Sequence, residues 1–190
     1  MRSSLKILFA GACLLVGMGT AQAGFMSFTI GVDTQFPTQG AICCGSGTAV
    51  VGAGVEFPAG SFPSYNTNAF VDVSDLQIDY GQTAATTYTA AAFNGFRFYD
   101  ALGTIAPITG VTINGATNLA GFNASRLSFD ADNIYINLQS LAAGGAHLVR
   151  LDVQFGAAAV PEPSTLLLLG AGLAAIAIPV RRRRRRTLLQ

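Results

Sequence analysis

The chain has 190 residues, of which 51% are hydrophobic and only 11% are charged, so it is too apolar to be an intrinsically disordered protein. Its formal net charge is +1, but the charges are segregated. Residues 24–160 carry three positive and nine negative side chains, a net charge of −6, between two basic and hydrophobic ends. With one His and no Trp, few side chains suited to catalysis are present.

Residues 1–23 have the pattern of a secretory signal peptide. Two basic residues precede an apolar run over 7–19, and Ala21 and Ala23 form a small-x-small cleavage pattern before Gly24. The alternative is a buried N-terminal helix. We expect export through the Sec machinery and cleavage by signal peptidase after Ala23.

Residues 24–157 alternate between apolar and polar side chains, which predicts half-buried antiparallel strands in one domain. The apolar positions change from odd to even near Ser74 and Asp75, so we expect a bulge or break there. Turn signals occur at Asn94-Gly95, Asn114-Gly115, Asp132-Asn133 and Gly144-Gly145. The strands are expected at 26–32, 49–57, 69–80, 87–93, 96–100, 110–113, 126–130, 134–138 and 147–155. The pattern predicts an all-β fold, an antiparallel β-sandwich of the jelly-roll or immunoglobulin-like kind, in preference to a closed barrel.

Cys43 and Cys44 are the two cysteines that remain after removal of residues 1–23. Adjacent Cα atoms lie ~3.8 Å apart, which is close for a disulfide. Three states stay open: a disulfide between the neighbours, a bridge between chains, or two reduced thiols. A metal site is disfavoured because His147 is the one imidazole in the chain.

Asp130 and Asp132 form a short acidic turn, and a second acidic stretch occupies 72–79. Such oxygen ligands could hold Ca²⁺, but Ile134 and Leu76 stand where a further ligand is needed. We therefore expect solvated turn residues, and we expect no metal or other cofactor.

Tyr135, Asn137 and Gln139 share one face of a predicted strand. A tyrosine beside two amides can stack on a sugar and hydrogen-bond to it, which makes these residues candidate exopolysaccharide contacts. A plain polar sheet face is the alternative.

Hydrolase chemistry is disfavoured. Ser46 and Ser61 lack the Gly-x-Ser-x-Gly pattern, because Cys44 and Ala59 stand at the first glycine position. His147 lies at an apolar position of its strand, which predicts a hydrogen-bonded, partly buried ring or a residue at the strand end and not a general base. We expect that the protein is not an enzyme.

A proline-flanked segment at 158–165 follows the domain. Proline fixes φ and favours extended geometry in the preceding residue, so this linker should be an accessible recognition peptide. Its central residues are Val160, Pro161, Glu162, Pro163 and Ser164.

Residues 166–180 form an uncharged apolar run that predicts a transmembrane helix. Fifteen helical residues span about 22 Å against a hydrocarbon core of about 30 Å, so flanking residues must extend the span. Six arginines follow: Arg181, Arg182, Arg183, Arg184, Arg185 and Arg186. Next to an apolar helix these arginines indicate a stop-transfer signal and contact with inner-membrane lipid, and not a nucleic-acid partner. Residues 181–190 should face the cytoplasm and the domain should face the periplasm.

Residues 160–190 resemble the PEP-CTERM sorting signal of Gram-negative bacteria, because a Pro-Glu-Pro motif, a hydrophobic segment rich in Leu and Gly and an Arg cluster occur in that order. The resemblance implies recognition by exosortase, a membrane-embedded cysteine protease-transpeptidase of organisms that make exopolysaccharide. Such a tail is also described as the C-terminal domain of ice-binding proteins, which by itself does not imply ice binding. The four residues after the arginines depart from the pattern, and we expect them to be harmless.

These features together predict an exported cell-envelope or extracellular-matrix protein. Its β-sandwich is expected to be structural or adhesive, with an exopolysaccharide-binding module as the alternative and a secreted hydrolase as the third reading. The chain should first be anchored in the inner membrane and then reach the cell surface or medium after processing.

Overall fold

The structure is a computed structural model that describes residues 23–61 and 67–157. The described residues form an all-β, antiparallel fold with two main sheets, as the alternating pattern predicts. The five-stranded sheet has the order β2-β1-β6-β9-β8, and the four-stranded sheet has the order β3-β4-β11-β7. A small third sheet pairs β5 with β10.

The strands have the following bounds: β1 Thr29–Gln35, β2 Ile42–Val50, β3 Ala69–Val73, β4 Gln77–Gln82, β5 Thr86–Thr87, β6 Gly95–Asp100, β7 Ile108–Ile113, β8 Leu127–Phe129, β9 Asn133–Asn137, β10 Ala142–Ala143 and β11 His147–Phe155. One short 3-10 helix, Ala124–Arg126, precedes β8. Within the described ranges, no helix has the length and apolar character needed to span a bilayer. The predicted membrane helix at 166–180, and the predicted signal peptide up to residue 22, lie outside these ranges.

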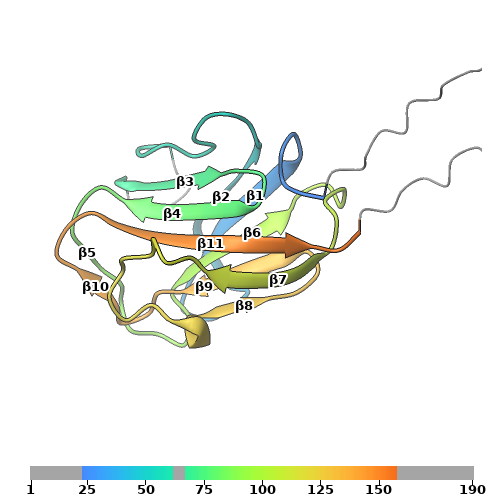
Figure 1. Ribbon diagram of the computed structural model, residues 1–190. Helices are drawn as coiled ribbons and strands as arrows, with labels where there is room; N and C mark the ends of the chain where they lie inside the picture. Colours follow the sequence, from blue (N-terminus) through green and yellow to red (C-terminus); the bar gives the residue numbers. More distant parts are fainter. Residues whose placement is uncertain (1–22, 62–66, 158–190) are drawn as a thin grey trace, which may run out of the picture.

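The core lies between the two main sheets, which pack face to face (Figure 1). Side chains alternate across each strand, so β11 buries Val149, Leu151 and Val153 and turns Arg150 and Asp152 outward. Each fully buried apolar side chain of this size contributes about 1.5–3 kcal/mol. The same alternation places Ile134 and Ile136 of β9 and Ile78 of β4 in the core, with less than 2% of their surface exposed.

Most predicted strands are confirmed, and the predicted break near Ser74 and Asp75 is the hairpin between β3 and β4. The prediction of a strand at 49–57 was wrong, because β2 lies at Ile42–Val50 instead. Glu56 accepts a hydrogen bond from Gly52 N at 2.9 Å and another from Val73 N at 2.7 Å. These bonds fold 51–57 into a loop beside β3, where Phe57 forms an isolated bridge with Val71.

The prediction of a strand at 87–93 was also wrong beyond Thr87. Tyr88 N donates to Leu141 O at 2.8 Å, and Phe93 N donates to Pro37 O at 2.9 Å. The segment is thus hydrogen-bonded to two different loops, so its backbone cannot pair with a single neighbouring strand. Gly95 was predicted in a turn but begins β6, where a Cβ would overlap the backbone of Ile136.

The sandwich has two distinct ends. Both ends of the described chain lie at one of them, which we call the proximal end (Figure 1). There Phe25 and Phe155 are in contact, and the void enclosed beside Phe25 measures only about 10 Å³. The opposite end, next to β5 and β10 and to the start of β11, is called the distal end.

Candidate functional site

A cleft of about 520 Å³ opens at the distal end, and we call it the distal cleft. Such a volume lies within the range of about 300–1,000 Å³ that is usual for small-molecule sites. The lining combines aromatic rings, amides, threonines and a cysteine pair, and none of its described residues is charged. Its residues are Phe36, Tyr80, Tyr88 and Phe96; Asn68, Gln82 and Asn94; Thr34, Thr67, Thr86, Thr87 and Thr89; and Cys43 and Cys44.

The cleft is polar because the inward-facing side chains of three central strands change from apolar to polar toward the distal end. Their inner-face side chains are apolar for most of the strand, but the last ones are Thr34 of β1, Gln82 of β4 and His147 of β11. These three are 7%, 2% and 5% exposed. Buried polar groups need hydrogen-bond partners, so the distal part of the core is organised by polar contacts as well as by packing.

Four of these side chains form a hydrogen-bonded cluster, which we call the tyrosine cluster: Tyr80, Gln82, Tyr88 and His147. The two tyrosine oxygens are 3.0 Å apart, and Gln82 Nε2 donates to Tyr80 at 2.6 Å and to Tyr88 at 3.0 Å. Tyr88 lies 2.9 Å from His147 Nε2. Tyr80 also packs on Phe96 across the two sheets, with ring centroids 4.6 Å apart.

One contact determines which atom donates and which accepts in each hydrogen bond of the cluster. His147 Nδ1 lies 3.2 Å from the carbonyl oxygen of Gly145, which can only accept, so in the neutral ring Nδ1 is protonated. Nε2 then accepts from Tyr88, and the Tyr88 oxygen accepts from Tyr80 and Gln82. The predicted hydrogen-bonded ring of His147 is confirmed, because the ring is 5% exposed and both ring nitrogens are engaged.

Burial keeps both tyrosines of the cluster protonated. It raises the pKa of Tyr80 to about 12, although the hydrogen bonds that Tyr80 forms with Tyr88 and Gln82 oppose the shift. Burial, together with the nearby charge that an ionised Tyr80 would carry, also raises the pKa of Tyr88. At neutral pH the Tyr80 and Tyr88 hydroxyls are therefore uncharged donors and acceptors.

Cys43 and Cys44 are joined by a disulfide between adjacent residues at the rim of the cleft. Along β1 the register advances two residues, from Asp33 to Gln35, while the partner strand β2 advances four. The two additional residues form a bulge, and Cys44 adopts a positive φ of 58°. The bulge turns the disulfide toward the cleft, next to β1.

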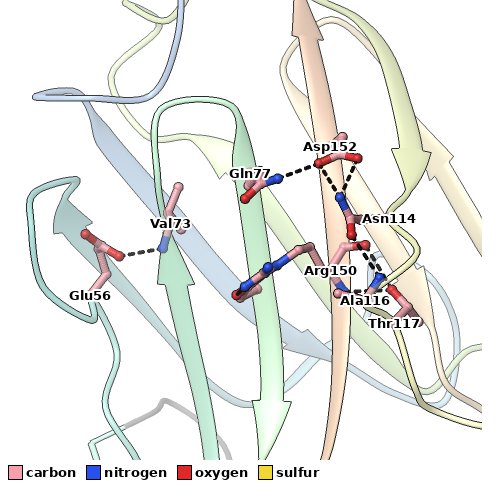
Figure 2. Close-up of polar contacts among 9 residues, drawn as sticks. Glu56, Val73, Gln77, Asn114, Ala116, Thr117, Arg150 and Asp152 are labelled. Atoms are coloured by element: carbon pink, nitrogen blue, oxygen red, sulfur yellow. Dashed lines mark hydrogen bonds and ion pairs between the residues drawn. The ribbon is translucent and has the colours of Figure 1, made fainter.

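The outer face of the four-stranded sheet carries polar contacts that join its strands. Figure 2 shows Asp152 accepting hydrogen bonds from Gln77 and Asn114, which connects β4, β11 and the end of β7. Arg150 Nε also donates to Asp79 at 2.7 Å, and this pairing raises the pKa of Arg150. These side chains are engaged in hydrogen bonds that join the strands of the sheet.

A buried ion pair lies on the outer face of the other sheet. Asp33 is fully buried and accepts hydrogen bonds from Arg97 Nε and Gln35 Nε2, both at 2.9 Å. The guanidinium also lies 4.2 Å from the ring centroid of Tyr99, which in turn covers Gly31. The arrangement fixes the pairing of β1 with β6.

The candidate sugar contacts Tyr135, Asn137 and Gln139 are each half-buried. Tyr135 is half-buried between neighbouring strands. Asn137 Oδ1 accepts from Asn94 N and Gln139 N, both at 3.1 Å, and Gln139 Oε1 accepts from Ser140. The two amides therefore hold the turn after β9.

The candidate calcium ligands Asp130 and Asp132 lie in the turn between β8 and β9. Asp130 Oδ1 accepts from Asp132 N at 2.9 Å and from Asn133 Nδ2 at 2.8 Å. Burial acts to raise the pKa of Asp130, but these hydrogen bonds outweigh it and lower the pKa. Across 23–61 and 67–157, no three His, Cys, Asp or Glu side chains are placed to hold a metal ion.

Gly24 and Phe25, next to the predicted signal peptidase site, are packed into the domain. Gly24 is buried, and a Cβ at this position would overlap the carboxylate of Asp75. Phe25 N donates to Asp75 O at 2.9 Å, and the Phe25 ring belongs to the core. The sorting residues 160–164 and the arginines at 181–186 lie outside the described residues.

Tyr80, Gln82 and Tyr88 were not foreseen as site residues. A usable signal was present in the sequence, since Gln82 and His147 stand at apolar positions of two strong alternating strands. Polar residues at the ends of core strands indicate a place where the core opens. Pairing Gln82 with His147, however, required the register of β4 and β11.

Fold and site together define an antiparallel β-sandwich domain with a neutral distal cleft. In the comparison with known protein families, residues 159–186 match the PEP-CTERM protein-sorting motif. The motif supports export of the chain and sorting through exosortase. Neither the curated proteins nor the solved structures contain a significant match.

Proposed function

We propose that this protein is a structural or adhesive component of the cell envelope or extracellular matrix, exported by residues 1–23 and processed at its sorting motif. One observation carries the proposal: the motif begins at residue 159, four residues after β11 ends at Phe155. A complete folded domain thus directly precedes the recognition segment. The chain is held in the inner membrane by 166–180 until exosortase acts at the Pro-Glu-Pro segment.

The geometry of the domain supports this order of events. Phe155 lies at the proximal end, so whatever holds the tail holds the domain by that end. Strand β11 has nine residues and spans about 30 Å, which places the distal end well away from the attachment point. The proposal assigns no catalysis to the domain, and the engagement of both ring nitrogens of His147 supports that assignment.

The test follows the full chain in a bacterium that contains exosortase, in parallel with a strain that lacks it. The wild-type domain should lose its tail and appear at the surface or in the medium, whereas Glu162→Ala should stay full length in the membrane fraction. Leu188→Ala, placed after the arginines, serves as the control and should be processed normally. Equal processing of Glu162→Ala and wild type, or a full-length chain dissolved in the cytosol with residues 1–23 attached, would contradict the proposal.

A further inference from the structure

We propose that the distal cleft binds a neutral saccharide. The inference deepens the adhesive role and rests on the proposed function only in requiring that the domain is displayed outside the cell. It places the saccharide between the sheets, and not on the outer face that carries Tyr135 and Asn137.

The lining selects against charged ligands. Among the described residues, no Asp, Glu, Lys or Arg lines the cleft, and burial raises the pKa of Tyr80 and Tyr88 still further above neutral pH. A carboxylate or ammonium group entering this space would lose hydration without gaining a counter-charge. An uncharged ligand has no such penalty.

The lining also matches the two kinds of surface that a sugar ring presents. The threonine hydroxyls of the rim, such as those of Thr87 and Thr89, can both donate and accept, as ring hydroxyls require. Phe36 and the disulfide offer apolar surface for the C–H faces of the ring.

The position of the cleft suits a ligand that lies outside the cell. Residues 23 and 157, the first and last that the structure describes, are at the proximal end, so the cleft is at the part of the domain that points away from the membrane during anchoring. The rim residues Asn68, Thr87 and Thr89 are exposed. An oligosaccharide can therefore approach the cleft while the tail is still attached.

The experiment uses the full chain, purified in a zwitterionic detergent without a sugar headgroup, because sugar detergents would occupy the site. Neutral hexasaccharides of glucose, xylose and mannose are titrated by calorimetry, with oligogalacturonate as the charged comparison. We expect at least one neutral hexasaccharide to bind and oligogalacturonate to give no heat. The affinity should be unchanged between low and high salt, because the contacts involve no ions.

Two pairs of variants locate the site. Phe36→Ala should lower the affinity about tenfold and Thr87→Ala about fivefold. Their controls, Phe129→Ala and Thr112→Ala, replace exposed residues elsewhere and should bind as wild type does. Thr87 lies on the exposed rim, so this variant remains informative even if Phe36→Ala unfolds.

The inference is overturned if no neutral hexasaccharide binds, if oligogalacturonate binds in a salt-dependent way, or if the controls lose as much affinity as the cleft variants. These results do not depend on processing. A protein that is sorted normally but binds no saccharide would refute the inference and leave the proposed function standing. A protein that binds a saccharide but is not processed would refute the proposed function and leave the inference standing.

Discussion

Phe25 and Phe155, near the first and last residues of the folded domain, meet edge-to-face with ring centroids 4.8 Å apart. Phe25 is 2% exposed, and Phe155 is partly buried against the same core. The contact closes the proximal end of the sandwich and joins the two segments that lead to the predicted signal peptide and the sorting motif. The domain is therefore held together at the end that leads to both of these segments.

Phe25→Ala is expected to lower the free energy of unfolding by about 3–4 kcal/mol, because it removes a buried aromatic ring and leaves a cavity. Phe155→Ala should cost less, since its ring is only partly buried. The double variant should cost less than the sum, because both residues share one contact. Urea denaturation measures all three, with exposed Phe129→Ala as the control that changes stability by less than about 0.5 kcal/mol. An additive double variant would show that the rings stabilise the domain independently.

Arg97→Met is expected to destabilise the domain by about 3 kcal/mol, because it leaves the fully buried Asp33 carboxylate without its counter-ion. Adding Asp33→Asn should recover most of that loss by removing the unpaired charge. The control is Arg150→Met in the other sheet, where the partner Asp79 is 14% exposed and the expected cost is about 1 kcal/mol or less. If the double variant is no more stable than Arg97→Met, the buried charge is not the cause.

Asp72 should make stability fall as the pH rises. Burial, followed by the charges of Glu56 and Asp79, raises the pKa of Asp72 above its usual 3.8 in the folded state. The folded state therefore binds more protons than the unfolded state just above pH 3.8, and stability decreases with pH there. Asp72→Asn should remove this decrease and raise stability at pH 7 by less than about 1 kcal/mol.

Asp130→Asn is the matched control, because the pKa of Asp130 is lowered and its contribution has the opposite sign. That variant should lose stability at pH 7, relative to wild type, and the difference should vanish at low pH. Thermal unfolding from pH 3 to 7 measures both variants. Parallel pH curves for Asp72→Asn and the wild type would contradict the assignment.

Reduction of the Cys43–Cys44 disulfide should have little effect on stability. The bond joins adjacent residues, so it restricts the unfolded chain far less than a bond that closes a long loop. We expect Cys43→Ser with Cys44→Ser to change the free energy of unfolding by about 1 kcal/mol or less. In mass spectrometry of the exported protein, alkylation should add no label before reduction and two labels after it. Two labelled thiols without reduction would show that the exported chain holds reduced cysteines.

Much of the fold could be predicted from the sequence, because alternation along a strand is a local property. The positions of β11 and β9 and the turn at Asp132 follow from neighbouring residues alone. The strand predicted at 49–57 failed because Glu56 forms hydrogen bonds to Gly52 and Val73 that no local pattern displays. The segment after Thr87 failed for the same reason, since its partners lie in two distant loops.

The sequence by itself determined that the body is built of antiparallel strands and that the tail is a sorting signal, because periodicity and short motifs are written in consecutive residues. Only the tertiary structure decided where the body has a cleft. Thr34, Gln82 and His147 come from three strands far apart in the chain, and they meet at one end of the sandwich only because strand pairing sets their register. The tertiary structure also brings Tyr88 within hydrogen-bond distance of His147, 59 residues away in the chain, a contact that no pattern in the sequence predicts.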